Sequence, residues 1–248
     1  MATAVRYDEI GLSYRQSRQP DPRIGAQVMA ALGDAQTIVN VGAGPGSYEP
    51  SDRRLAAVEP SAVMLAQRNA TAAPGLRAVA EALPFADRSF DAALAILTVH
   101  HWTDVARGLA ELRRVAARIV ILATAAERIN RLWLTADYFP GSARARRPDV
   151  QPGAIAAILG GEVRIETVLV PRDCTDGFGE AYWARPEAYL DPAIRAGMSA
   201  CSLLTPDELA DGVRRLGADL AAGRWDERHG YLRELSELDT GHRLIIAT

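Results

Sequence analysis

The sequence predicts an α/β protein built on a mostly parallel sheet of seven strands with helices on both faces. Short apolar runs alternate with stretches whose apolar residues repeat at helical spacing, which is typical of parallel βαβ winding. The first apolar run, residues 37–41, leads into a glycine-rich loop, and the second, residues 55–58, ends on Glu59. Glycines and an acid at neighbouring strand ends are typical of a nucleoside site at the carboxyl edge of such a sheet.

The other elements follow from local pattern and capping signals. Further strands are expected at 76–79, 90–97, 119–123, 163–170 and 243–247. A helix should begin at Pro22 behind Asp21 and stop at Gly33. Further helices are expected at residues 61–69, over 105–115 behind Thr103 and Asp104, and after the capping box Thr205-Pro206-Asp207-Glu208, with a helical or irregular stretch at 126–152. Pro50 predicts a stunted or absent helix between the glycine loop and Glu59.

The glycine spacing narrows the class of ligand. The loop reads G-x-G-x-G, with Gly42, Gly44 and Gly46, whereas a dinucleotide fingerprint reads G-x-G-x-x-G. Ser47 occupies the position of the third dinucleotide glycine. The spacing therefore favours a nucleoside ligand without a pyrophosphate.

Four blocks in order resemble the class I S-adenosylmethionine-dependent methyltransferases, closest to the small-molecule branch (methyltransferase type 11) that includes ubiquinone-biosynthesis-like enzymes. The blocks are residues 39–46, 57–61, 80–91 and 97–102. The resemblance implies a Rossmann-like fold, with the last strand inserted antiparallel beside the fifth, and a helical cap. It also implies S-adenosylmethionine as cofactor.

We expect a single methyltransferase domain over residues 1–248. Residues 1–33 would form an N-terminal helical lid, residues 34–124 the cofactor-binding half, and residues 125–248 the substrate cap and C-terminal strands.

The resemblance also implies which residues bind the cofactor. Glu59 would accept both ribose hydroxyls, for which a carboxylate has enough lone pairs. The other expected cofactor residues are Tyr14, Arg18, Asn40, Gly42, Ala43, Gly44, Gly46, Pro60, Ala80, Glu81 and Leu97. The chain departs from the family by having Asn40 and Val79 where relatives usually have Asp. Arg18 and Tyr14 would reach the methionine portion of the cofactor from the lid, although a solvated helix face is an alternative for this segment.

His100 and His101, at the end of the fourth strand, are the candidate catalytic bases, because imidazole titrates near neutrality. Adjacent residues at a strand end point in opposite directions, so one of the two is expected to pack structurally. A purely structural role for both is the alternative.

The acceptor site is expected within residues 125–200, where aromatic and acidic residues occur together. The candidates are Trp133, Tyr138, Asp173, Phe178 and Trp183. This composition fits an apolar or aromatic acceptor with a few polar groups. The alternative is that these aromatic residues form the core of a helical cap.

Composition excludes several other classes. A net charge of −3 over 248 residues provides no basic surface for nucleic acid, and no apolar segment is long enough to span a membrane. The two cysteines form neither a disulfide framework nor a metal-type spacing, so no metal and a cytoplasmic location are expected. The expected partner is a small-molecule methyl acceptor. Two alternatives stay open: a cofactor-binding enzyme that catalyses another reaction such as cyclisation, and a non-catalytic S-adenosylmethionine-binding protein.

Overall fold

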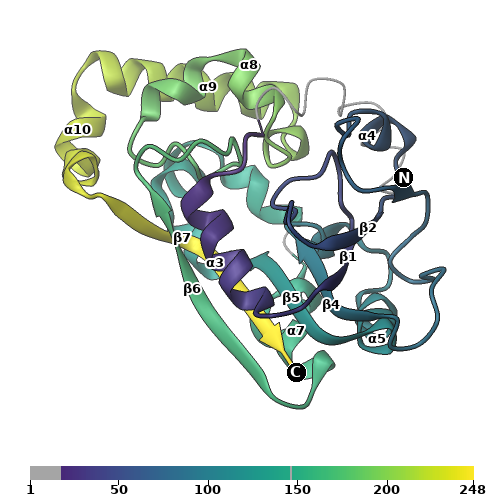
Figure 1. Cartoon of the computed structure of the whole chain (residues 1–248). Coiled ribbons are helices and arrows are strands. Elements are labelled where there is room, and N and C mark those ends of the chain that lie inside the picture. The colour runs from purple at the N-terminus through teal and green to yellow at the C-terminus, as the bar shows by residue number, and fades with distance from the viewer. Residues whose placement is uncertain (1–17, 146) are drawn as a thin grey trace.

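A computed structural model describes residues 18–145 and 147–248, and a seven-stranded sheet organises them (Figure 1). The strand order is β3-β2-β1-β4-β5-β7-β6. The strands are β1 Thr37–Val41, β2 Arg54–Val58, β3 Gly75–Leu76, β4 Phe90–Ile96, β5 Ala116–Thr124, β6 Val163–Pro171 and β7 Glu237–Ala247. The first five pair in parallel, and β7 lies antiparallel between β5 and β6. The predicted position and direction of the last strand are confirmed.

The strand order places a switch point beside β1. The chain passes from β1 outward to β2 and β3 and then returns to form β4 on the other side of β1. Ligands of open α/β sheets bind outside the carboxyl ends of the strands at such a switch. The loop after Val41 therefore occupies the position that the fold offers to a ligand.

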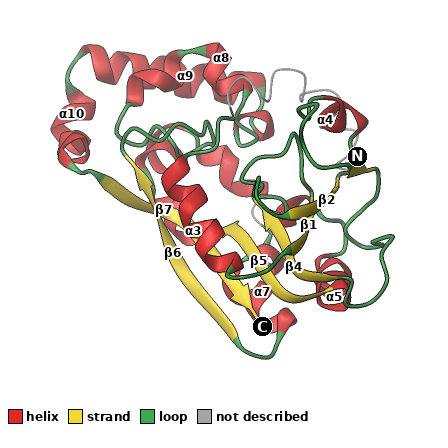
Figure 2. Cartoon of the chain, in the orientation of Figure 1, coloured by secondary structure: helices red, strands yellow, loops and turns green. Residues whose placement is uncertain are grey.

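Helices cover both faces of the sheet (Figure 2). Helix α3 (Pro22–Leu32) packs Val28 and Leu32 onto the face that carries Ile38 and Leu94. On the opposite face, α5 (Val105–Val115) and α7 (Pro152–Leu159) bury their apolar sides against residues such as Ile121. Because strand side chains alternate, neighbouring residues of one strand contribute to the two separate cores.

A helical cap stands over the carboxyl ends of the parallel strands (Figure 1). Two insertions build it, one between β5 and β6 and one between β6 and β7. Its helices are α6 (Ala126–Arg131), α8 (Pro192–Ala196), α9 (Pro206–Ala221) and α10 (Arg224–His229), together with the π-helical turn Leu134–Tyr138 and the 3₁₀ turns Pro140–Ala145, Pro148–Val150, Pro186–Leu190, Cys201–Leu203 and Gly230–Glu234.

Several predicted boundaries change. The third strand, at the sheet edge beside β2, has only two residues, and Val79 falls outside it. The helix expected at 61–69 shortens to α4, Ala62–Ala66, capped by Ser61. No helix forms between β1 and β2, as Pro50 predicted.

The predicted lid over residues 1–33 needs correction in its second half. Helix α3 is not a cover over the cofactor site but a layer of the fold, since Ile24 and Val28 are 1% exposed against the sheet. Residues 1–17 lie outside the described part of the chain. No helix within residues 18–145 and 147–248 is long and apolar enough to cross a membrane.

Candidate functional site

The glycine loop is held tightly against the ends of two strands. The backbone N–H groups of Gly42 and Ala43 both donate to the carbonyl of Val58, at 2.8 and 3.0 Å. Gly42 has a φ of +70°, and a Cβ there would lie 1.9 Å from Oγ1 of Thr98. Only glycine allows the loop to turn this closely past the end of β4.

Glu59 is a fixed carboxylate beside this loop. Its Oε2 accepts a hydrogen bond from the backbone N–H of Gly44 at 2.9 Å, and its Oε1 accepts one from the N–H of Ser61 at 3.0 Å. The residue is 7% exposed. A carboxylate has about four lone-pair sites, so its chemistry suits the two hydroxyls of a ribose.

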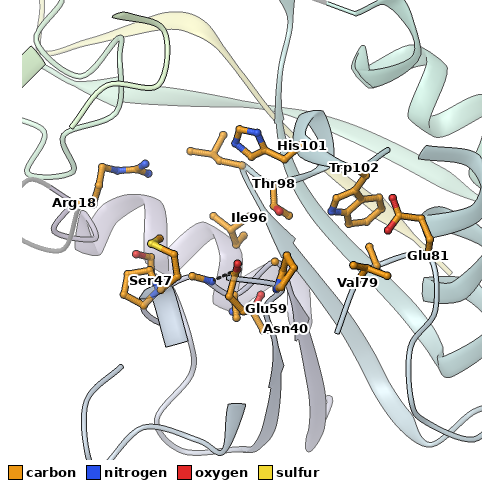
Figure 3. Close-up of a pocket in the computed structure, with 18 of the residues that line it drawn as sticks. Arg18, Asn40, Ser47, Glu59, Val79, Glu81, Ile96, Thr98, His101 and Trp102 are labelled. Carbon is orange, nitrogen blue, oxygen red and sulfur yellow. Dashed lines mark hydrogen bonds between the residues drawn. The ribbon is translucent and has the colours of Figure 1, made fainter. Parts of the chain in front are cut away.

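The loop, Glu59 and the end of β4 surround a cavity of about 150 Å³, which we call the first cavity (Figure 3). Its lining residues are Arg18, Asn40, Gly42, Ala43, Gly44, Pro45, Ser47, Glu59, Pro60, Met64, Val79, Ala80, Glu81, Ile96, Leu97, Thr98, His101, Trp102 and Thr103. Ten of the twelve residues predicted to bind the cofactor are among them. Gly46 is not in the lining, and Tyr14 lies outside the described residues. Met64, Ile96 and Thr98 were not expected among the cofactor residues; Met64 and Ile96 lie outside the four blocks, and Thr98 lies within the block 97–102.

Asn40 has one side-chain atom that needs a partner. Its Nδ2 donates to Oε1 of Glu49 at 2.9 Å, whereas its buried Oδ1 has no hydrogen-bond partner among the described residues. Glu49 is itself paired with Arg68 at 2.8 Å. Buried polar atoms are rarely left unbonded, so Oδ1 is a candidate acceptor for a ligand donor group.

Two further predicted residues have local structural roles. Oε1 of Glu81 accepts hydrogen bonds from the N–H groups of Thr103 and Asp104, at 2.7 and 3.1 Å. Leu97 adopts a φ of +49°, which is unusual for a residue other than glycine. Its N–H donates to the carbonyl of Leu122 at 2.8 Å, which holds this strained turn at the cavity wall.

A second cavity of about 140 Å³ adjoins the first. The two share Arg18, Leu97 and His101. The rest of the second cavity is lined by His100, Thr124, Ala126, Ile129, Ser142, Val150, Gln151, Phe178, Gly179, Glu180, Gly197, Ser199, Ala200, Leu203 and His242. Most of these belong to the cap, and apolar residues such as Ile129, Val150 and Phe178 line the cavity together with polar ones such as Gln151 and Glu180.

The two adjacent histidines lie together. They end the 3₁₀ turn Val99–His101, and their ring centroids are 3.8 Å apart with the planes inclined by 48°. The expectation that they point in opposite directions is wrong, because the chain has left the extended conformation before it reaches them. His101 lines both cavities and His100 lines only the second.

Arg18 lies between the cavities, but an acid inside the protein also binds it. Its Nε donates to Oδ1 of Asp176 at 2.5 Å, and a second guanidinium nitrogen donates to Oδ2 at 3.2 Å. Asp176 is 1% exposed and accepts a further bond from the hydroxyl of Tyr48 at 2.9 Å. Burial, together with Asp176, raises the pKa of Tyr48 well above its usual range. This network has no local signal in the sequence, because its members are distant along the chain.

Of the predicted acceptor residues, only Phe178 lines the second cavity. Trp133 and Trp183 are 3% and 0% exposed and belong to the cap core, where the Trp133 indole N–H donates to the carbonyl of Trp183 at 2.9 Å. Tyr138 is also buried there, with its ring centroid 5.8 Å from that of Trp133. Asp173 is at the surface, paired with Arg23 at 2.7 Å. For these four, the expectation of acceptor contact is corrected: three are core residues and one is a surface ion pair.

The fold and the first cavity define the class of protein: an α/β protein with a cavity at the switch point of its sheet, lined by a glycine loop and a buried carboxylate. The family model for the methyltransferase domain matches residues 39–123. The crystal structure of a protein of Anabaena variabilis, described as a putative methyltransferase from an antibiotic biosynthesis pathway, is 32% identical. The match covers 94% of this chain and 99% of that one, with a TM-score of 0.85. This chain therefore belongs to the S-adenosylmethionine-dependent methyltransferase family.

More distant structures share the fold alone. YcgJ of Bacillus subtilis is 16% identical, with 91% of this chain and 96% of that chain covered and a TM-score of 0.52. The [4+2]-cyclase SpnF is 13% identical, with 99% and 96% covered and a TM-score of 0.55. The search of curated proteins found no match.

Proposed function

We propose that this protein transfers a methyl group from S-adenosylmethionine to an oxygen, nitrogen or carbon atom of a small-molecule acceptor. The observation that carries the proposal is the shared wall of the two cavities, formed by Arg18, Leu97 and His101. Methyl transfer requires the donor and the acceptor to be held side by side in a suitable orientation. Two adjoining cavities with a shared wall can hold them in this way.

The first cavity fits the cofactor on three counts. The Gly42 turn, which only glycine allows beside Thr98, places loop backbone in the cavity wall. Glu59 offers its carboxylate to a ribose diol, and Asn40 Oδ1 can accept from an ammonium group. Bound S-adenosylmethionine supplies a methyl carbon made electrophilic by the positive charge on sulfur. Arg18 is less suited than expected to hold the carboxylate of the methionine portion, because Asp176 already binds it.

The chain's own contribution is to orient the acceptor, exclude water and manage a proton. The cap residues Ile129, Val150 and Phe178 give the second cavity apolar walls that favour an acceptor with an apolar body. His101 lies on the shared wall. There an imidazole could take the proton of an acceptor hydroxyl as the hydroxyl oxygen bonds to the transferred methyl carbon. His100 is its direct neighbour and the second candidate for this role.

The test is incubation of the purified chain with S-adenosylmethionine and a set of small phenols and alcohols, followed by mass spectrometry. The expected result is a product heavier by one methylene and an equal amount of S-adenosylhomocysteine. His101→Gln should retain cofactor binding and lose most of the turnover, about 10²-fold or more if it is the base. An acceptor converted without S-adenosylhomocysteine would instead favour a cyclase or another non-methylating reaction. A folded protein that binds neither form of the cofactor would contradict the proposal.

A further inference from the structure

The second cavity contains a buried histidine that the transfer reaction, as proposed, does not use. His242 lies on β7, in register with Thr124 of β5 and Val168 of β6, and is 1% exposed. It lines the second cavity but not the first. It is therefore part of the acceptor chamber away from the wall where the methyl group would pass.

Only one of its two ring nitrogens has a partner. Nδ1 is 2.9 Å from Oγ1 of Thr240, whereas the buried Nε2 has no hydrogen-bond partner among the described residues. The ring also packs on Phe178, with centroids 4.4 Å apart and planes inclined by 45°. An unbonded polar atom inside a protein costs free energy, so a polar ligand group that bonds to it is strongly favoured over an apolar one.

The environment keeps this imidazole neutral. Burial lowers the pKa of His242 to about 4, and the charged groups that act on it are Asp176, Arg18, Arg243 and Asp239. A neutral imidazole has one N–H donor and one acceptor nitrogen. If Nδ1–H donates to Thr240, Nε2 is an acceptor; in the other tautomer Nε2–H is a donor. A hydroxyl group can both donate and accept, so it fits either tautomer.

We propose that His242 Nε2 is the recognition point for a hydroxyl group on the methyl acceptor, which makes the acceptor an apolar hydroxylated small molecule such as a phenol. The proposal rests on the proposed function only in identifying the bound molecule as the methyl acceptor. Binding of a hydroxylated molecule at this site does not itself require methyl transfer. His242 anchors the molecule through one hydroxyl, while Phe178 and the apolar cap residues contact its body.

Two probes that differ by one hydroxyl test this directly: 4-methylphenol and toluene. The full chain, labelled with ¹⁵N-histidine, is titrated with each probe, and the Nε2 resonance of His242 is assigned by its absence in a His242→Asn variant. The chain has four histidines, so the spectrum is simple. We expect 4-methylphenol to shift the Nε2 resonance and to bind about threefold to tenfold more tightly than toluene, the usual contribution of one neutral hydrogen bond.

Matched variants separate the role of Nε2 from that of the ring. Asparagine places its polar group near the Nδ1 position and can keep the Thr240 contact, whereas glutamine places its amide nearer the Nε2 position. His242→Gln should therefore retain part of the preference for 4-methylphenol, and His242→Asn and His242→Phe should lose it. Equal binding of the two probes, no binding of the phenol, or binding without a shift at Nε2 would overturn the proposal.

The same samples are titrated with S-adenosylhomocysteine. A protein that binds S-adenosylhomocysteine but shows no preference for the phenol overturns the role of His242 alone. A protein that prefers the phenol but binds no S-adenosylhomocysteine overturns the proposed function and leaves the hydroxyl site standing.

Discussion

Gly42 and Thr98 are packed so closely that a Cβ on the glycine would lie 1.9 Å from the threonine Oγ1 and 2.7 Å from its Cβ. Such distances are far below van der Waals contact, and the φ of +70° at Gly42 adds backbone strain for any other residue. The turn that shapes the first cavity therefore depends on this pair.

Gly42→Ala should lower the free energy of unfolding by about 2 kcal/mol or more and abolish cofactor binding, because the loop must move away from β4. Urea unfolding measures the first effect. The control is Gly153→Ala, where nothing lies within 4 Å of the added Cβ and the stability should change by less than about 1 kcal/mol. In a double-mutant cycle, Thr98→Gly should recover part of the loss; strict additivity of the two substitutions would contradict the steric explanation.

Asp176 is the centre of the network that joins the segment at Arg18 to the cap. Asp176→Asn leaves the Arg18 guanidinium, 9% exposed, without its bidentate anion, so the free energy of unfolding should fall by about 2–4 kcal/mol. Tyr48→Phe removes a neutral donor to the same carboxylate and the 3.3 Å acceptor of the Asp21 N–H, and should cost less, about 1–2 kcal/mol. Chemical denaturation of the two variants measures the difference. If Asp176→Asn were as mild as Tyr48→Phe, the ion pair would contribute little to the fold.

His242 should make stability depend on pH in a defined window. The pKa of His242 is about 4 in the folded protein, below the 6.5 of an unperturbed histidine, so the unfolded chain binds a proton more readily. The free energy of unfolding should therefore fall as the pH is lowered from about 6.5 to about 4, by about 3 kcal/mol in total from this residue. The difference between wild type and His242→Asn isolates the contribution of His242 from that of the acidic residues. A difference that stays constant across that range would show that the ring is not held neutral.

The sequence was sufficient to predict those helix ends and strand bounds that depend on neighbouring residues alone. Asp21 caps α3 by accepting from the N–H of Arg23, and Thr205 and Glu208 form both bonds of the predicted capping box. The strand after the first helix was predicted with its exact bounds, Thr37–Val41, because a buried parallel strand is a continuous apolar run bounded by polar residues and glycine.

The second cavity, the proposed acceptor site, could not be predicted in the same way. Buried tryptophans give the same composition whether they line a pocket or fill a core, and Trp133 and Trp183 fill the core of the cap. His242 reaches the chamber only because β7 inserts between β5 and β6, far along the chain from Leu97. Such long-range pairing has no local signal in the sequence, and neither has the network of Asp176.

The central claim is that the first cavity binds the cofactor through Glu59. Calorimetric titration with S-adenosylhomocysteine, applied to wild type, Glu59→Ala and the exposed control Glu162→Ala, tests it most directly. We predict micromolar binding by wild type and by Glu162→Ala, and a loss of about thirtyfold or more in Glu59→Ala, which removes a charged acceptor of two hydroxyls. A folded wild type that does not bind, or a Glu59→Ala variant that binds as tightly as wild type, would contradict the account.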